Sequence, residues 1–251
     1  MPFALELYYS AHAGDRAKDP PVVLIHGAGG NHLSWPAQLR RLPGYTVYAL
    51  DLPGHGKSGG KGLASIPEYG RIVCEWLGLA GLTKVVIAGH SMGSAIALWL
   101  ALEHPDQVTA LILIGAGARM HVHPELLQGS GEPASFLSVV SQVTDWSYAE
   151  QAPENMVRLA RQRMAEIPPQ VLSGDFLACD GFDVMDRLER VGQPALVICG
   201  EVDRLTPLKH ARFLASQLPN ARLVVVPGAG HMVMLEKPGE VAAAVTGFLT
   251  G

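Results

Sequence analysis

The chain has 251 residues, of which 48% are hydrophobic and 17% charged, which suits one large globular domain or a domain with a sizeable insertion. The formal net charge of −4 and the lack of any Lys/Arg-rich run argue against nucleic-acid binding. The sequence contains no apolar run of about 18 residues, the minimum for a membrane span, so we expect none.

The cysteines indicate a reducing compartment. Cys74, Cys179 and Cys199 are far apart, odd in number and without a CxxC pair, which argues against a disulfide framework. The N-terminal segment MPFALELYYSAHAGDRAKDPP has no basic stretch followed by a long apolar one, so we expect no signal peptide. We therefore expect a cytoplasmic protein.

Apolar, β-rich runs alternate with helix-like segments along most of the chain. This pattern is typical of a parallel sheet covered by helices on both faces. The expected strands occupy residues 3–11, 20–27, 45–51, 84–90, 108–117, 193–200 and 221–231. The expected helices occupy residues 34–42, 65–82, 92–104, 208–218 and 238–249.

The alternation is interrupted over residues 118–187. No run in this segment resembles a buried strand, and five prolines divide helix-like pieces. We therefore expect residues 1–117 and 188–251 to form an α/β core. Residues 118–187 are expected to form a helical lid, inserted between two strands and lying over one edge of the sheet.

The segment VVIAGHSMGSAIAL runs from a predicted strand directly into a predicted helix, with Ser91 at the junction. A residue at such a sharp turn adopts a sparsely populated backbone conformation, and its hydroxyl points away from both elements. Gly89 and Gly93 fit the same interpretation, because a Cβ at either position would collide where strand and helix cross. The pattern predicts a nucleophile elbow that exposes Ser91.

A serine hydroxyl is a weak nucleophile until an oriented base takes its proton. His231 lies in a glycine-rich loop just past a predicted strand, and Glu201 and Asp203 follow the preceding strand, where doubly wound sheets place their sites. Asp203 is favoured over Glu201 because it lies two residues further into the loop and turns back towards the histidine more easily. The predicted catalytic residues are therefore Ser91, Asp203 and His231.

The order Ser, Asp, His along the chain belongs to the α/β-hydrolases, and the whole chain resembles this superfamily. The segments VVLIHGAGG, DLPGHGKS, GHSMGSAIAL, GEVDRLTP and PGAGHMVMLEKP resemble its motifs and occur in the family's order. The resemblance implies the α/β-hydrolase fold, with a mostly parallel, doubly wound sheet and a helical cap inserted between two strands. Within the superfamily, the chain is most similar to the serine carboxylesterase and enol-lactonase branch.

The resemblance also implies an oxyanion hole formed by the backbone N–H groups of Ala28 and Met92. The Met92 amide opens a predicted helix and therefore has no partner within it. His26 and His55 lie in glycine-rich turns and are interpreted as structural.

The expected substrate-binding residues are Gly27, His90, Phe136 and Trp146. Gly27 belongs to a loop that approaches the substrate closely, and His90 precedes the nucleophile. Phe136 and Trp146 belong to the predicted lid and would form an apolar wall. No metal site is expected, because the HVHP segment at 121–124 offers two histidines without a third ligand.

The sequence predicts a serine hydrolase that cleaves carboxylic esters of small to medium size through an acyl-enzyme on Ser91, without a cofactor. The expected partner is a small-molecule ester, and the sequence specifies no oligomeric state. Lactone or enol-lactone hydrolysis, C–C bond hydrolysis and cofactor-free perhydrolysis on the same residues remain alternatives. A ligand-binding receptor on this fold is the non-enzymatic alternative.

Overall fold

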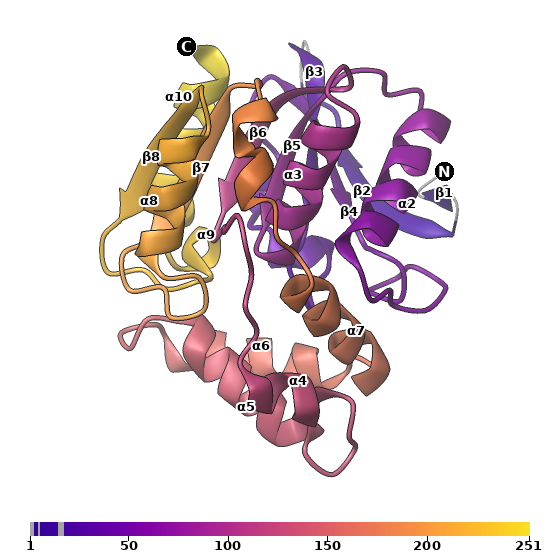
Figure 1. Ribbon diagram of the computed structural model, residues 1–251, viewed down its shortest axis with the longest axis vertical. Helices are drawn as coiled ribbons and strands as arrows, with labels where there is room; N and C mark the ends of the chain where they lie inside the picture. Colours follow the sequence, from indigo (N-terminus) through magenta and orange to yellow (C-terminus); the bar gives the residue numbers. More distant parts are fainter. Residues whose placement is uncertain (1–2, 5, 15–17) are drawn as a thin grey trace.

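The computed structural model describes residues 3–4, 6–14 and 18–251. These residues form an eight-stranded sheet with the order β1-β2-β4-β3-β5-β6-β7-β8, surrounded by helices (Figure 1). The strands are β1 (Phe3–Ala4), β2 (Leu7–His12), β3 (Lys18–Ile25), β4 (Tyr45–Leu50), β5 (Val85–His90), β6 (Val108–Ile114), β7 (Ala195–Gly200) and β8 (Ala221–Val226).

Strands β3 to β8 pair with one another in parallel, as the alternation of strands and helices predicts. The N-terminal edge differs from the sequence expectation of a single strand over residues 3–11. Glu6 has a left-handed backbone with φ 60°, and the chain reverses there. Strands β1 and β2 therefore pair antiparallel with each other, and β2 pairs antiparallel with β4.

The central strands are buried on both faces. In β3, Val23 and Ile25 belong to one hydrophobic core, and Val22 and Leu24 belong to the other. Helices cover both faces, so the strands read as continuous apolar runs in the sequence. The first face is covered by α2 (Ile66–Leu79), α3 (Met92–Glu103) and α8 (Leu208–Gln217), and the second by α1 (Ala37–Arg40), α9 (Val233–Glu236) and α10 (Pro238–Thr250).

Two predicted helices are shorter or more divided than expected. Residues 34–42 form the end of a 3₁₀ turn (His32–Ser34) and then α1. Pro36 caps α1 with an extended backbone, because a proline ring and its missing N–H suit the start of a helix and not its interior. Another 3₁₀ helix, Met185–Arg190, leads into β7 and lies partly in the expected insertion.

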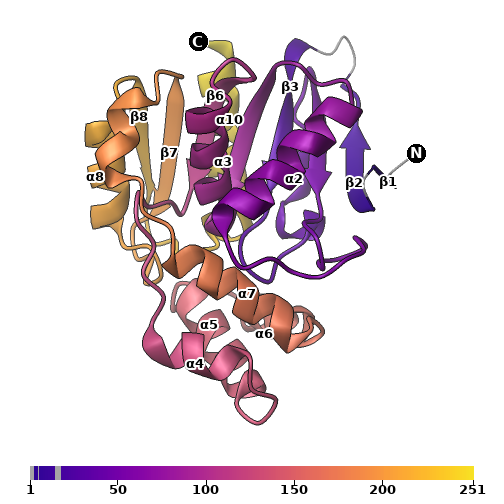
Figure 2. The same cartoon turned by 45° about the vertical axis from the view of Figure 1, so that its right-hand side comes forward.

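The expected insertion, all of which is described, contains four α-helices between β6 and β7: α4 (Pro124–Ser130), α5 (Phe136–Ser147), α6 (Glu154–Ala165) and α7 (Pro169–Asp180). Figures 1 and 2 show them grouped at one end of the sheet. We call residues 118–187 the insertion below. Among the described residues, no helix is long and apolar enough to cross a membrane.

The insertion has a small hydrophobic core of its own. Phe136 is 5% exposed and packs there with Val140, Leu172 and Phe176. This placement differs from the expectation that Phe136 binds substrate. Its position at the start of the amphipathic helix α5 turns it towards the other helices of the insertion.

Candidate active site

Ser91 lies at the junction of β5 and α3 with φ 51° and ψ −119°. This strained backbone is rare for a residue with a side chain. The flanking glycines make the turn possible: a Cβ on Gly89 would lie 2.1 Å from the carbonyl oxygen of Gly93, and a Cβ on Gly93 would lie 2.1 Å from that of Ile25. Strand, turn and helix are therefore packed too closely for any other residue at these two positions.

The first backbone hydrogen bonds of α3 are donated by Ser94 and Ala95 to the carbonyl oxygen of Ser91. The amide of Met92 precedes them, so the helix itself provides no acceptor for it. This amide lies at the positive end of the helix dipole, next to Ser91. It is suited to stabilise negative charge close to the serine hydroxyl.

Asp203 and His231 come from the loops that follow β7 and β8. The Nδ1 atom of His231 donates to Oδ2 of Asp203 at 2.9 Å, and the two residues are 3% and 5% exposed, respectively. Glu201, the alternative acid, is exposed and accepts a hydrogen bond from the amide of Gly228. The structure therefore brings Asp203, and not Glu201, to the imidazole.

Thr206 is a member of this network that the sequence analysis did not identify. Its hydroxyl donates to Oδ2 of Asp203 at 2.8 Å, and the amides of Leu205 and Thr206 both donate to Oδ1 at 2.9 Å. The Thr206 hydroxyl is also 3.1 Å from Nδ1 of His231. The local sequence DRLT could have predicted this contact, because an aspartate in a turn often accepts from the amides two and three residues later.

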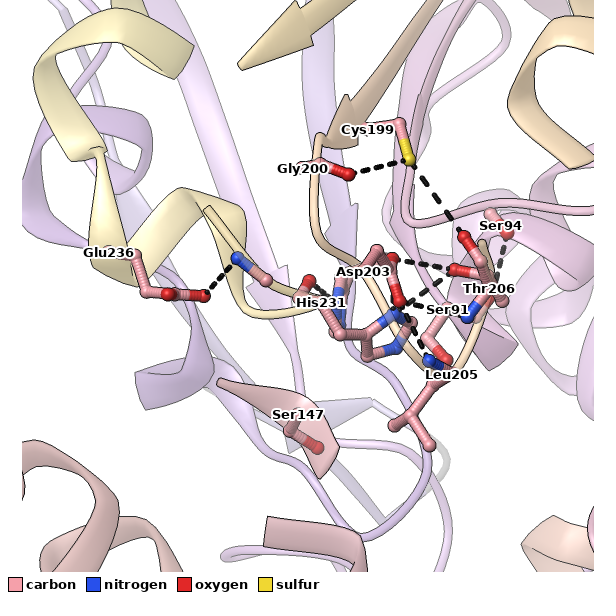
Figure 3. A network of polar contacts seen from close by, with 12 residues as sticks. Ser91, Ser94, Ser147, Cys199, Gly200, Asp203, Leu205, Thr206, His231 and Glu236 are labelled. Carbon is pink, nitrogen blue, oxygen red and sulfur yellow. Dashed lines mark hydrogen bonds and ion pairs between the residues drawn. The ribbon is translucent and has the colours of Figure 1, made fainter. Parts of the chain in front are cut away.

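Figure 3 shows Asp203, Thr206 and His231 joined by these bonds and draws Ser91 next to the imidazole. Burial opposes ionisation of Asp203, but the adjacent His231 and the hydrogen bonds from Thr206 outweigh it and lower the pKa of the Asp203 carboxyl. An ionised carboxylate at this position fixes the proton on Nδ1 of His231. The other ring nitrogen is then an acceptor, as a general base requires.

His90 contacts both the backbone and the ring of His231. Its Nε2 atom donates to the carbonyl oxygen of His231 at 3.1 Å, and the two rings are 4.7 Å apart. Burial and the neighbouring His231 ring lower the pKa of His90 to about 3. His90 is therefore a neutral hydrogen-bond donor that holds the backbone of His231.

The loop after β3 carries Gly27 and Ala28 against the nucleophile. A Cβ on Gly27 would lie 2.9 Å from Nδ1 of His90 and 3.0 Å from Cβ of Ser91, so only a glycine allows this approach. His26 fastens the base of the loop, donating from Nδ1 to the carbonyl of Gly27 and accepting at Nε2 from the amide of Leu52. Burial and the adjacent His55 lower the pKa of His26 to about 4, consistent with this neutral tautomer.

A cavity of about 760 Å³ opens at these residues. Ser91 and His231 both line it, together with the expected residues Gly27, Ala28, His90 and Trp146. Phe136 is not among the described lining residues. The insertion instead contributes Trp146, Tyr148 and Phe176 as aromatic walls.

The comparisons with known proteins agree with this fold. The family model for the alpha/beta hydrolase fold matches residues 20–238. The pimeloyl-[acyl-carrier protein] methyl ester esterase of Yersinia enterocolitica is 30% identical, over 92% of this chain and 93% of that protein.

Two solved structures are similar over almost their full length. A thermophilic esterase has a TM-score of 0.84 at 34% identity, covering 97% of this chain and 98% of the other. The enol-lactonase of Burkholderia xenovorans LB400 shares the fold, with a TM-score of 0.87 at 22% identity, covering 98% of this chain and 96% of the other. The chain belongs to the α/β-hydrolase fold family, and it is an esterase-like hydrolase.

Proposed function

We propose that the protein is a serine carboxylesterase that hydrolyses small to medium esters through an acyl-enzyme on Ser91. The observation that carries this proposal is the buried 2.9 Å hydrogen bond from His231 to Asp203, because His231 lines the same cavity as the strained Ser91. A residue with a side chain that is held in this backbone conformation lowers the stability of the fold. A paired imidazole in the same cavity gives that serine a chemical use.

In the acylation step, the Ser91 hydroxyl oxygen attacks the ester carbonyl carbon while Nε2 of His231 takes the hydroxyl proton. Asp203 stabilises the resulting imidazolium through Nδ1. The carbonyl oxygen becomes an oxyanion, and the amides of Met92 and Ala28 donate to it. The tetrahedral intermediate collapses, the imidazolium gives its proton to the alcohol, and the alcohol leaves.

In the deacylation step, a water molecule replaces the alcohol. His231 takes a proton from this water as its oxygen attacks the acyl carbon, and the same two amides stabilise the second oxyanion. Collapse breaks the bond to the Ser91 oxygen, which recovers the proton from the imidazolium. The carboxylic acid then leaves, and neither a metal nor an organic cofactor takes part in the proposed cycle.

We propose that the insertion acts as the lid of this site. Trp146 and Phe176 provide apolar surface on the cavity wall, and Gly27 and His90 line the same cavity next to the nucleophile. Hydrolysis of lactones, cleavage of C–C bonds and perhydrolysis would use the same residues. They are therefore tested as alternative reactions on a substrate panel.

The test of the proposed function is Ser91→Ala. With p-nitrophenyl butyrate, the wild-type protein is expected to turn over many times, and the variant is expected to lose about 10³-fold or more in kcat. A fluorophosphonate should label Ser91 stoichiometrically, as read by mass spectrometry of the digested protein. A folded Ser91→Ala protein with wild-type turnover would refute the proposal, and a single turnover by the wild type would favour the receptor alternative.

A further inference from the structure

Asp175 is a fully buried carboxylate that the proposed reaction does not use. It lies in α7 of the insertion and is 0% exposed. It is not among the described residues that line the cavity. A buried carboxylate is costly unless it is paired and hydrogen-bonded, so the partners of Asp175 indicate what it does.

Three donors from the α/β core surround this carboxylate. The amide of Gly29 donates to Oδ2 at 2.8 Å, Nε2 of His55 donates to the same oxygen at 2.9 Å, and the hydroxyl of Tyr69 donates to Oδ1 at 2.6 Å. They come from the loop after β3, the loop after β4 and helix α2. Asp175 therefore joins the insertion to three separate parts of the core.

The partners of Asp175 are themselves held. Tyr69 accepts at its hydroxyl from the amide of Leu63, and Nδ1 of His55 is 3.0 Å from the carbonyl of Pro53. A carbonyl and a carboxylate both accept, so both nitrogens of His55 donate and the ring is an imidazolium. Asp175 and His55 thus form a buried ion pair in which both carboxylate oxygens accept and both ring nitrogens donate.

Gly29 gives this network its significance for the reaction. It directly follows Ala28, the proposed oxyanion donor, and has a left-handed φ of 61°. Side chains of the insertion surround it: a Cβ on Gly29 would lie 3.0 Å from Leu172 and 3.3 Å from Ile167. The loop after β3 is therefore fixed by its hydrogen bond to Asp175 and by packing against other side chains of the insertion.

We propose that Asp175 is a positioning residue for the oxyanion hole: by binding the Gly29 amide, it sets the direction of the neighbouring Ala28 amide. The insertion then completes the catalytic site and does more than cover it. This inference rests on the proposed function, because the Ala28 amide needs a fixed direction only if an oxyanion forms beside it.

The expected effect is on the transition state and not on substrate binding. Loss of one oxyanion donor typically costs about 10²–10³-fold in kcat, and a displaced donor should cost part of this. For Asp175→Ala we expect a loss of about 30-fold or more in kcat with KM within about threefold. Asp175→Asn keeps one acceptor oxygen for Gly29, so it should retain more activity than the alanine variant.

Tyr69→Phe is the matched control. It removes a hydrogen bond from the same carboxylate, at Oδ1, but leaves the bond between Gly29 and Oδ2 in place. We expect it to lower the thermal midpoint while kcat stays within about threefold of the wild type. If Asp175 had a structural role alone, the two variants would lose activity in proportion to their loss of stability.

Inhibitor binding separates positioning from simple damage. A trifluoromethyl ketone forms a tetrahedral adduct whose oxygen needs the oxyanion hole, so its inhibition constant should rise in parallel with the loss of kcat/KM. Binding of butyrate, a product without a tetrahedral centre, should change little. A folded Asp175→Ala protein that keeps wild-type kcat and ketone affinity would overturn the proposal. Asp175→Leu, which also removes the acceptor but leaves less empty space, provides the same comparison if the alanine variant does not fold.

An NMR measurement makes failure of this proposal distinct from failure of the proposed function. The amide protons of Ala28 and Gly29 should shift in Asp175→Ala or Asp175→Leu, which remove the acceptor, and remain near their wild-type positions in Tyr69→Phe. Unchanged shifts in the folded variant without the acceptor would refute the positioning role even if the protein is an esterase. Absence of ester turnover and of Ser91 labelling in the wild type would refute the proposed function whatever the amides show.

Discussion

Asp203 and Glu201 lie in one loop, but their carboxylates have different partners. Asp203 accepts from His231 and from two backbone amides, whereas Glu201 accepts from Gly228. Replacing Asp203 by Asn should allow the wrong imidazole tautomer, with the proton on Nε2 facing Ser91. We expect Asp203→Asn to lower kcat by about 10²–10⁴-fold, measured with p-nitrophenyl butyrate.

Glu201→Gln is the control for that variant, because the change in charge is the same and the position is two residues away. It should leave kcat within about twofold, since surface substitutions away from such networks have small effects. Thermal unfolding of both variants should show that they are folded. Comparable losses in the two variants would mean that the acid has been assigned to the wrong residue.

Residues of the site differ in how well the sequence predicts them. Ser91 and His231 follow predicted strands in glycine-rich segments, so local patterns indicate them. Asp175 could not be found in this way, because Gly29, His55 and Tyr69 are between 106 and 146 residues away along the chain. Nothing in the local sequence of α7 marks its aspartate as buried, and only the packing of the insertion on the core brings the partners together.

At the scale of elements, the close crossing of β5 and α3 requires a glycine at position 93, because any side chain there would collide with the backbone. In Gly93→Ala, the new Cβ would lie 2.1 Å from the carbonyl oxygen of Ile25, and backbone atoms cannot give way cheaply. We expect the free energy of unfolding to fall by about 3 kcal/mol or more, as measured by urea denaturation.

Gly247→Ala is the matched substitution in a helix. Gly247 lies in α10, it is exposed, and a Cβ there would have nothing within 4 Å. Alanine loses less backbone entropy on folding than glycine, so this variant should gain about 0.5 kcal/mol. If both variants changed stability equally, close contact at Gly93 would not be the cause.

The contact between the insertion and the core should depend on pH through His55. Burial alone would lower the pKa of His55, but the Asp175 carboxylate outweighs it, so the folded-state pKa lies above the ordinary value of 6.5. His55 therefore binds its proton more tightly in the folded state than in the unfolded chain. The stabilisation is complete below about pH 6.5 and is lost as the pH rises through the folded-state pKa.

The measurement is the difference in unfolding free energy between the wild type and His55→Gln across the pH range. This difference should be largest below about pH 6.5 and should shrink as the pH rises above it, through the folded-state pKa of His55. Lys57→Gln, in the same loop but outside the ion pair, should show a constant difference. A difference for His55→Gln that does not vary with pH would contradict the ion pair.

The elements themselves were predictable to different degrees. The strands β5 and β7 are buried along their whole length, and β6 is buried along most of it. Their sequences are therefore continuous apolar runs, which are typical of central strands covered on both faces and could be recognised from the sequence. The N-terminal edge was predicted less well, because the turn at Glu6 uses a left-handed residue that has no glycine signal. The short helix α1 was predicted too long, since its bounds depend on Pro36 and not on apolar periodicity.

At the scale of the whole molecule, the residues that line the cavity are mainly cationic, although the chain as a whole is negatively charged. The protein has a formal net charge of −4. Among the described lining residues, however, Asp180 is the single carboxylate, and the cationic side chains are Arg119, Arg163, Arg204 and Lys209. These cations come from the insertion and from the loop and helix after β7, and Arg119 also forms an ion pair with Asp183. All four are exposed as well as part of the lining, so we take them to mark the mouth of the cavity.

This charge distribution predicts a preference among esters. An ester that carries a carboxylate should be attracted to the mouth, and the attraction should be screened by salt, since the Debye length falls from about 30 Å at 0.01 M to about 8 Å at 0.15 M. We expect kcat/KM for p-nitrophenyl hydrogen glutarate to fall by about threefold or more over this range of ionic strength. For the neutral p-nitrophenyl valerate, kcat/KM should change little.

A pair of variants on α6 tests the origin of this preference. Arg163 lines the cavity, whereas Arg158 is an exposed arginine on the same helix that does not belong to the lining. Arg163→Gln should reduce both kcat/KM for the anionic ester and its salt dependence, because one cation at the mouth is removed. Arg158→Gln makes the same change in net charge and should leave both nearly unchanged. Equal effects of the two variants would assign the attraction to the overall charge of the protein and not to the mouth of the cavity.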